Sequence, residues 1–174
     1  MVGETQIVAA NKSHNKKVKA MSLIPERPTV HKTVLASIEE ADIIVLGPGS
    51  LYTSIIPNLL VEGVCEAIGK AEGQVVYVCN IMTQPGETDG FTLIEHVQVI
   101  EEYLGKGVIK HIIANDSWPD TEVIEHYNED GAALVLPLEE DSRIVAIPMV
   151  TLDRFYGYVR HNSEVLSNTI MSLI

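Results

Sequence analysis

Two polar loops carry the groups of this 174-residue chain that are best suited to chemistry. The first, residues 47–54, reads GPGSLYTS and follows the apolar run of residues 43–46. Glycines let a backbone approach a ligand closely, and hydroxyls beside the N–H groups of a starting helix can bind phosphate. The candidate ligand-binding residues here are Gly47, Pro48, Gly49, Ser50, Tyr52, Thr53 and Ser54. The alternative is an ordinary strand-to-helix turn, because the loop matches neither the P-loop nor the GxGxxG pattern.

The second loop, residues 80–92, reads NIMTQPGETDGFT and is longer than the usual connector of about two to six residues. Its candidate ligand-binding residues are Asn80, Thr83, Gln84, Glu87, Thr88 and Asp89. Asn and Gln amides suit a nucleobase edge. Glu87 or Asp89 could accept from sugar hydroxyls or hold a metal together with a phosphate. The alternative is a pair of turns, at residues 85–86 and 89–90, with solvated carboxylates.

No catalytic group and no resident metal site is predicted. The six histidines show neither HExxH spacing nor a fixed relation to Cys or Ser. Ser50 and Ser54 lack the GxSxG elbow that marks a hydrolase nucleophile. His161 follows Arg160 just before the last expected helix, where a cap or an anion contact is the role to test.

The elements that position these loops alternate between strands and helices. The apolar patterns predict strands and helices over separate ranges: strands at 42–46, 74–79, 108–114, 132–136 and 143–148, and helices at 30–41, 93–104, 120–128 and from 163. Pro57 and Gly63 split the region after the first loop into two helical pieces, and Pro119 is expected near the first helical position. Thr92 and Glu95 have the capping-box spacing.

This alternation predicts a Rossmann-like three-layer α/β sandwich with a mainly parallel sheet. In such folds ligands bind beyond the carboxyl ends of the strands. Both polar loops follow such ends, so we expect them to form one ligand site.

The N-terminal segment is expected to form a β-hairpin from residues 2–8 and 17–24, although its apolar alternation is imperfect. Residues 1–28 then make a hairpin segment and residues 29–174 the sheet and helices of one domain. The chain opens directly on strand-like sequence, whereas an α/β domain more naturally begins with a core strand and its first turn. We therefore expect a further N-terminal part to be missing.

The composition excludes several classes of protein. The net charge is -12; residues 1–37 carry six lysines and arginines against two acidic residues, and the remainder carries six against twenty-two. Such an acidic body argues against a nucleic-acid binder. No apolar run is long enough for a bilayer, and the N-terminus lacks the form of a signal peptide. Cys65 and Cys79 are expected to be reduced core thiols, which predicts a cytoplasmic protein. A homo-oligomer is compatible with these features.

Three motifs carry a resemblance to a known family: GPGSLYTSIIPNLL, CNIMTQPGETDGFT and YVRHN. They resemble the gluconeogenesis-factor proteins of the YvcK type, which are related to the 2-phospho-L-lactate transferases (CofD) of the deazaflavin pathway. The resemblance covers essentially the whole chain. It implies a cytoplasmic bacterial protein that binds a nucleotide-sugar, with UDP-N-acetylglucosamine as the first candidate. The implied role is to support cell shape and wall synthesis during growth on gluconeogenic carbon sources.

The resemblance also bears on the boundaries and on activity. The opening VGETQI resembles the family's mid-chain VGES segment, which implies that its glycine-rich GGGTG turn lies upstream and that this is the C-terminal portion. The positions that agree with the transferase pattern GPSNPxTSIxP are Gly47, Pro48, Thr53, Ser54, Ile55 and Pro57. Gly49, Ser50 and Leu51 depart from it, which weakens the implied transferase activity. Residues 80–89 follow the gluconeogenesis-factor version.

Two functions therefore stay open. One is a regulatory protein that binds a nucleotide-sugar through residues 47–54 and 80–89. The other is a transferase that acts on a nucleotide diphosphate conjugate, which Mg²⁺ could accompany. A third possibility is that this portion alone binds no ligand, because the N-terminal part expected upstream would supply the glycine-rich phosphate turn.

Overall fold

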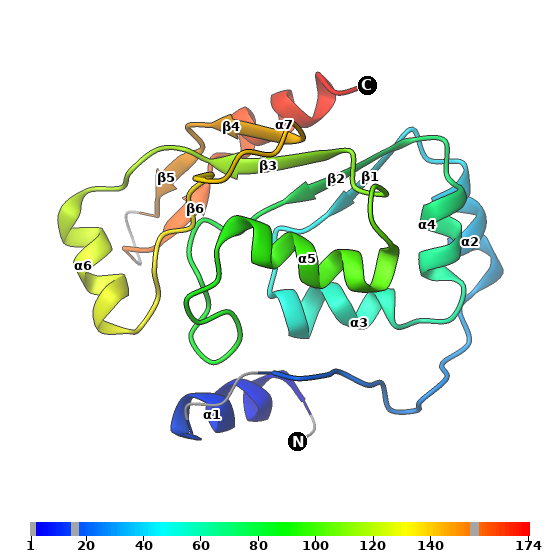
Figure 1. The fold of residues 1–174 in the computed structure, drawn as a ribbon, viewed down its shortest axis with the longest axis horizontal. Coiled ribbons are helices and arrows are strands. Elements are labelled where there is room, and N and C mark those ends of the chain that lie inside the picture. The colour runs from blue at the N-terminus through cyan, green and yellow to red at the C-terminus, as the bar shows by residue number, and fades with distance from the viewer. Residues whose placement is uncertain (1–2, 15–17, 154–156) are drawn as a thin grey trace.

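A parallel β-sheet forms the middle layer of the computed structural model, which describes residues 3–14, 18–153 and 157–174 (Figure 1). Its strands are β1 (Ile43–Leu46), β2 (Gln74–Val78), β3 (His111–Asn115) and β4 (Ile144–Ile147). They lie side by side in the order β1-β2-β3-β4, and each neighbouring pair is parallel. Runs of Ile and Val favour such strands, because β-branched side chains pack well on a sheet that is covered on both faces.

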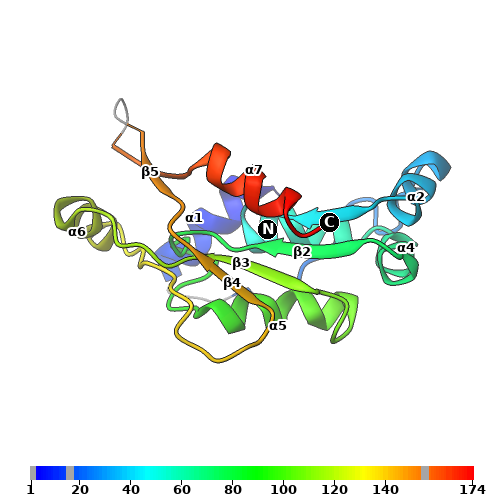
Figure 2. The same ribbon diagram turned by 90° about the horizontal axis from the view of Figure 1, so that it is seen from above.

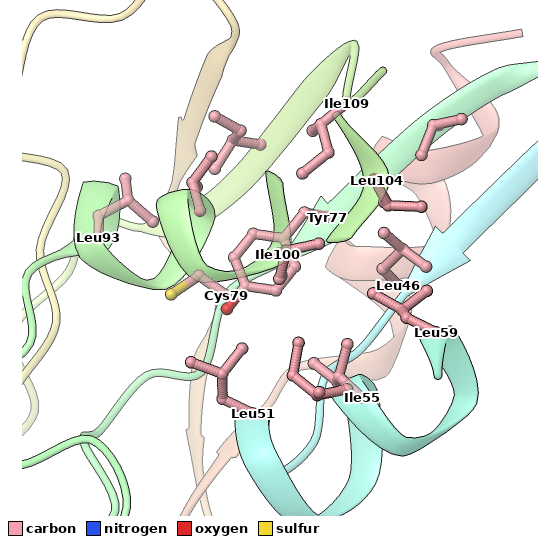
Figure 3. Packing of buried hydrophobic residues seen from close by; sticks show 14 of the residues in the cluster. Leu46, Leu51, Ile55, Leu59, Tyr77, Cys79, Leu93, Ile100, Leu104 and Ile109 are labelled. Carbon is pink, nitrogen blue, oxygen red and sulfur yellow. The ribbon is translucent and has the colours of Figure 1, made fainter. Parts of the chain in front are cut away.

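One face of the sheet packs against helices that lie between the strands in sequence. These are α3 (Ile56–Leu59), α4 (Val64–Lys70) and α5 (Leu93–Leu104), and α2 (Lys32–Glu39) packs beside α4. Figure 3 shows Tyr77 of β2 among Leu51, Ile55 and Ile100, which all belong to one buried cluster. This cluster is the main hydrophobic core.

The opposite face is covered by α7 (Ser163–Met171), so the molecule has three layers (Figure 2). Val76, Val78, Ile113 and Met149 are buried there, and α7 packs Val165, Leu166 and Ile170 against them. The α7 helix begins where Asn162 Oδ1 accepts from the backbone N–H groups of the first turn. The predicted three-layer α/β fold is confirmed.

The predicted N-terminal hairpin is wrong. Residues 4–14 form the helix α1 (Glu4–His14), and residues 18–23 have no regular structure. The sequence of α1 contains Glu, Gln and Ala, which favour helix over strand, and the side-chain amide of Asn11 donates to the Gly86 carbonyl at 2.8 Å. The antiparallel hairpin of this fold lies near the C-terminus instead, between β5 (Val150–Leu152) and β6 (Val159–His161).

Other boundaries differ locally. Residues 132–136 make only an isolated bridge, between Leu134 and Met82, in place of the predicted strand. The helix α6 (Thr121–Glu129) starts after Asp120, so Pro119 precedes the cap. A π-helical turn, η1 (Leu51–Ile55), runs directly into α3. The predicted capping box of α5 is confirmed.

Within the described residues, no single helix is long and apolar enough to cross a membrane. The bent pair of segments Leu51–Leu59 and Val64–Lys70 reaches that length and apolar composition only when the two are taken together.

Candidate functional site

The two polar loops meet at the carboxyl edge of the sheet, as their sequence positions predicted. Leu46 of β1 lies opposite Tyr77 of β2, so the loops leave the sheet side by side. The Asn80 side chain accepts from the Gly49 N–H at 3.1 Å and donates to the Gly49 carbonyl at 2.9 Å. A further bond runs from Gln84 Nε2 to Ser50 Oγ at 2.8 Å. These bonds hold the loops as one unit.

Glu87 occupies the place where the sequence predicted an anion. Its carboxylate is buried and accepts from the Tyr52 backbone N–H at 3.2 Å and from Thr53 Oγ1 at 2.8 Å. A helix start offers unsatisfied donors and a partial positive charge, and the protein's own carboxylate meets them here. Tyr52 and Thr53 therefore both bind Glu87.

The rest of the second loop is also tied internally. Thr88 Oγ1 accepts from the Gln84 N–H at 2.9 Å, and Asp89 Oδ2 accepts from the Gly86 N–H at 2.8 Å. Thr83 Oγ1 accepts from the Ala133 N–H at 2.8 Å. These polar groups order the loop, whatever else they bind.

A cavity of about 550 Å³ opens beside the joined loops. The predicted site residues that line it are Pro48, Gly49, Ser50, Ser54, Asn80, Thr83 and Gln84. Those that do not are Gly47, Tyr52, Thr53, Glu87, Thr88 and Asp89. The structure thus brings about half of the predicted residues to one cavity, and their role in binding stays a prediction.

The other wall of the cavity comes from α6 and β6, for which the sequence suggested only a cap or an anion contact at His161. It includes Tyr127, Asp130, Val159, Arg160 and His161. The Val159 N–H donates to the Tyr127 hydroxyl at 3.0 Å and so joins helix to strand. The pair Arg160-His161 was the one signal available in the sequence, because α6 shows no motif.

Several polar groups that line the cavity have hydrogen-bond donors that a ligand can use. Ser50 Oγ accepts from Gln84, so its own proton remains to donate, and among the described residues it has no acceptor. Arg160 is the one lysine or arginine among the described lining residues. Its Nη1 donates to the Val159 carbonyl at 3.3 Å, and the guanidinium lies 5.5 Å from the Tyr158 ring centre.

His161 presents an acceptor. Its Nε2 lies 3.0 Å from the Cys79 carbonyl oxygen, which can only accept, so Nε2 carries the proton and Nδ1 is left as an acceptor. Burial lowers the pKa of His161, against a smaller opposite effect of the bond to Cys79. The neutral ring is therefore favoured in the fold.

No group of three or more His, Cys, Asp or Glu side chains gathers around a metal position in the described part of the chain. A Mg²⁺ ion that bridges phosphates needs only about one or two protein carboxylates. Asp130 is the carboxylate among the described lining residues, so it is the group that fits such an ion.

Comparison with known proteins places the chain. Residues 1–152 match the family described as 2-phospho-L-lactate transferase CofD. The chain belongs to the CofD family. This CofD-family chain is 36% identical over 176 residues to the gluconeogenesis factor of Halalkalibacterium halodurans, covering 98% of this chain and 53% of the relative. It is 41% identical over 177 residues to the putative gluconeogenesis factor of Thermotoga maritima, covering 98% and 54%.

A solved structure shares the fold of this CofD-family chain. The crystal structure of a member of the UPF0052 family from Bacillus halodurans superposes with a TM-score of 0.86 at 35% identity. The match covers 94% of this chain and 54% of that chain. The chain spans about half the length of the curated relatives it matches.

Proposed function

We propose that this chain binds a nucleotide-sugar, with UDP-N-acetylglucosamine as the first candidate, as part of a cytoplasmic regulatory protein. The proposed role is to support cell shape and wall synthesis during growth on gluconeogenic carbon sources. The observation that carries the proposal is the cavity between the joined loops and the wall of α6 and β6, with Arg160 as its cation.

The size and chemistry of the cavity support this ligand class. Its volume of about 550 Å³ lies in the range of small-molecule sites, about 300–1,000 Å³. In a chain of net charge -12, a diphosphate needs a local cation and hydroxyl donors. Arg160, Ser50 and Ser54 supply them on one cavity. The names of the relatives support the regulatory role.

A transferase is the second candidate, because the matching family is described as 2-phospho-L-lactate transferase CofD. The described contacts give it less support. Ser50 Oγ pairs with the Gln84 amide, which cannot act as a general base. Residues 49–51 also depart from the transferase pattern. Binding is therefore the proposal to test first.

The binding test is calorimetric titration of the 174-residue chain with UDP-N-acetylglucosamine. We expect saturable binding with one site per chain. Replacing Arg160→Ala should weaken binding about tenfold or more, because charge-assisted bonds to phosphate are lost. Lys106→Ala removes an exposed cation that does not line the cavity and should bind as the wild type does. Absence of saturable binding by the wild-type chain would overturn the proposal.

The transferase test incubates the chain with UDP-N-acetylglucosamine, Mg²⁺ and a small alcohol acceptor. Release of free nucleotide at a rate that depends on the enzyme concentration would favour the second candidate. Saturable binding without such release supports the regulatory function.

A further inference from the structure

We propose that Asp130 and Tyr127 form a subsite for vicinal hydroxyls, and that this subsite makes the cavity prefer a sugar-bearing diphosphate over a bare one. The inference rests on the proposed function and adds the part of the ligand that each wall receives. Neither residue belongs to the two loops that the sequence singled out.

The described wall of the cavity carries one full charge of each sign. Asp130 and Arg160 are the described lining residues with full charges of opposite sign. Asp130 is the C-cap of α6, where the partial negative charge of a helix end adds to its carboxylate. A carboxylate repels phosphate. The proposal therefore assigns the phosphates of a ligand to Arg160 and Ser50, and an uncharged group to Asp130.

The carboxylate of Asp130 is available to a ligand. The ion pairs of the described residues join Glu66 to Lys70 and join Arg143 to Glu101 and Asp141, and none includes Asp130. Among the described residues its carboxylate also accepts no hydrogen bond. Two oxygens of one carboxylate can accept from two neighbouring hydroxyls, as acidic residues do with ribose in dinucleotide sites.

Tyr127 supplies the complementary donor. Its hydroxyl accepts from the Val159 N–H, so the phenol proton remains to donate, and no described residue accepts it. The Tyr158 ring packs edge-on against the Tyr127 ring, with ring centres 6.3 Å apart. A hydroxyl both donates and accepts, so an acceptor at Asp130 and a donor at Tyr127 match a sugar ring better than a phosphate.

The placement of Asp130 also has a cost for the helix. An acidic side chain at a helix C-terminus is unfavourable because it meets the negative end of the dipole. Asp130 is exposed, so water screens this cost, and a ligand hydroxyl would replace that water.

The test compares UDP-N-acetylglucosamine, UDP and inorganic pyrophosphate by calorimetry, with and without Mg²⁺. For Asp130→Asn we expect binding of UDP-N-acetylglucosamine to weaken about tenfold and binding of pyrophosphate without Mg²⁺ to tighten about twofold. Opposite effects on two ligands cannot come from a loss of folding. Asp120→Asn, the same change at the other end of α6 and away from this cavity, is the matched control.

Each outcome is decisive. A loss of affinity confined to UDP-N-acetylglucosamine assigns the diol to the pyranose, and an equal loss for UDP assigns it to the ribose; both support the subsite. Asp130→Asn and Tyr127→Phe variants that bind UDP-N-acetylglucosamine like the wild type overturn it. A loss of pyrophosphate affinity in Asp130→Asn that appears only with Mg²⁺ also overturns the subsite, because it would make Asp130 a metal ligand. A wild-type chain that binds none of the three overturns the proposed function itself.

Discussion

At the scale of single residues, Glu87 joins the two loops that frame the cavity. It is 3% exposed, and its two oxygens accept from the Tyr52 N–H and the Thr53 hydroxyl. A buried carboxylate is tolerated only where such donors satisfy it. Its contribution therefore lies in the order of the loops, and Ser50 is left to face the cavity.

Replacing Glu87→Ala should lower the free energy of unfolding by about 3 kcal/mol, because two bonds to a charged group are lost and a buried N–H is left unpaired. Glu95→Ala is the control. Its carboxylate also accepts a backbone N–H at a helix start, but in an exposed position, so its loss should cost about 1 kcal/mol. Urea denaturation measures both. Equal losses would show that Glu87 does not hold the loops together.

His96 gives the fold a pH dependence. It is fully buried, and its Nδ1 lies 2.7 Å from the Thr92 carbonyl oxygen, so Nε2 is the site that would take a proton. Nε2 is buried without a partner among the described residues. Burial lowers the pKa of His96, against smaller opposite effects of Thr92 and Glu95.

The sign of the effect follows from proton linkage. Below the ordinary histidine pKa of about 6.5, the unfolded chain binds more protons than the folded chain. The stability that neutral His96 contributes is complete above about pH 6.5 and is lost as the pH falls through the lowered pKa of the folded state. We expect the free energy of unfolding to fall less between about pH 7 and pH 5 in His96→Leu than in the wild type. Parallel pH curves for the two proteins would contradict this.

At the scale of elements, Gly47 lets the first loop cross the end of β2. Its φ is +86°, and a Cβ there would lie 2.8 Å from the Val78 carbonyl oxygen. The Gly47→Ala variant should therefore lose about 2 kcal/mol or more of unfolding free energy, from backbone strain and the contact with a strand that cannot move.

Gly49→Ala is the control for this turn. A Cβ at Gly49 meets its nearest atom, Ser54 Cβ, at 3.5 Å, which is an ordinary contact. We expect this variant to lose much less stability, as measured by the midpoint of urea unfolding. A Gly47→Ala variant as stable as Gly49→Ala would show that the turn adapts.

The elements that sequence reasoning found are those with local signals. The apolar runs of β1, β2 and β3 and the Thr92 capping box of α5 each lie within a few residues. The meeting of the two loops followed from one rule, that parallel strands share a carboxyl edge. The wall of Tyr127 and Arg160 could not be found in this way, because its position depends on how the distant hairpin of β5 and β6 packs against α6.

Residue type alone also could not fix the role of a carboxylate. Glu87 and Asp130 are both acidic residues of polar segments, and only burial separates a group that ties two loops from one that lines a cavity. The error at α1 has a related cause. Its apolar residues are too few to set a clear period, so contacts such as Asn11 to Gly86 stabilise it where it lies.

At the scale of the whole molecule, the two faces of the sheet are covered unequally. Several helices bury the face of Tyr77 and Ile112, whereas α7 covers the centre of the other face (Figure 2). Val45 of β1 and Val76 of β2 are register partners on that second face. Val76 is 0% exposed and Val45 is 39% exposed. The second face is therefore covered at β2 and partly open to solvent at the neighbouring strand β1.

This pair tests the layer arrangement with one chemical change. Val76→Thr buries a hydroxyl without a partner and should lower the free energy of unfolding by about 2 kcal/mol. Val45→Thr, whose hydroxyl can reach water, should cost about 0.5 kcal/mol or less. Urea denaturation at several protein concentrations measures both. A cost at Val45 as large as at Val76 would mean that a further layer covers β1 in solution. If that cost also grew with protein concentration, the layer would be a second copy of the chain.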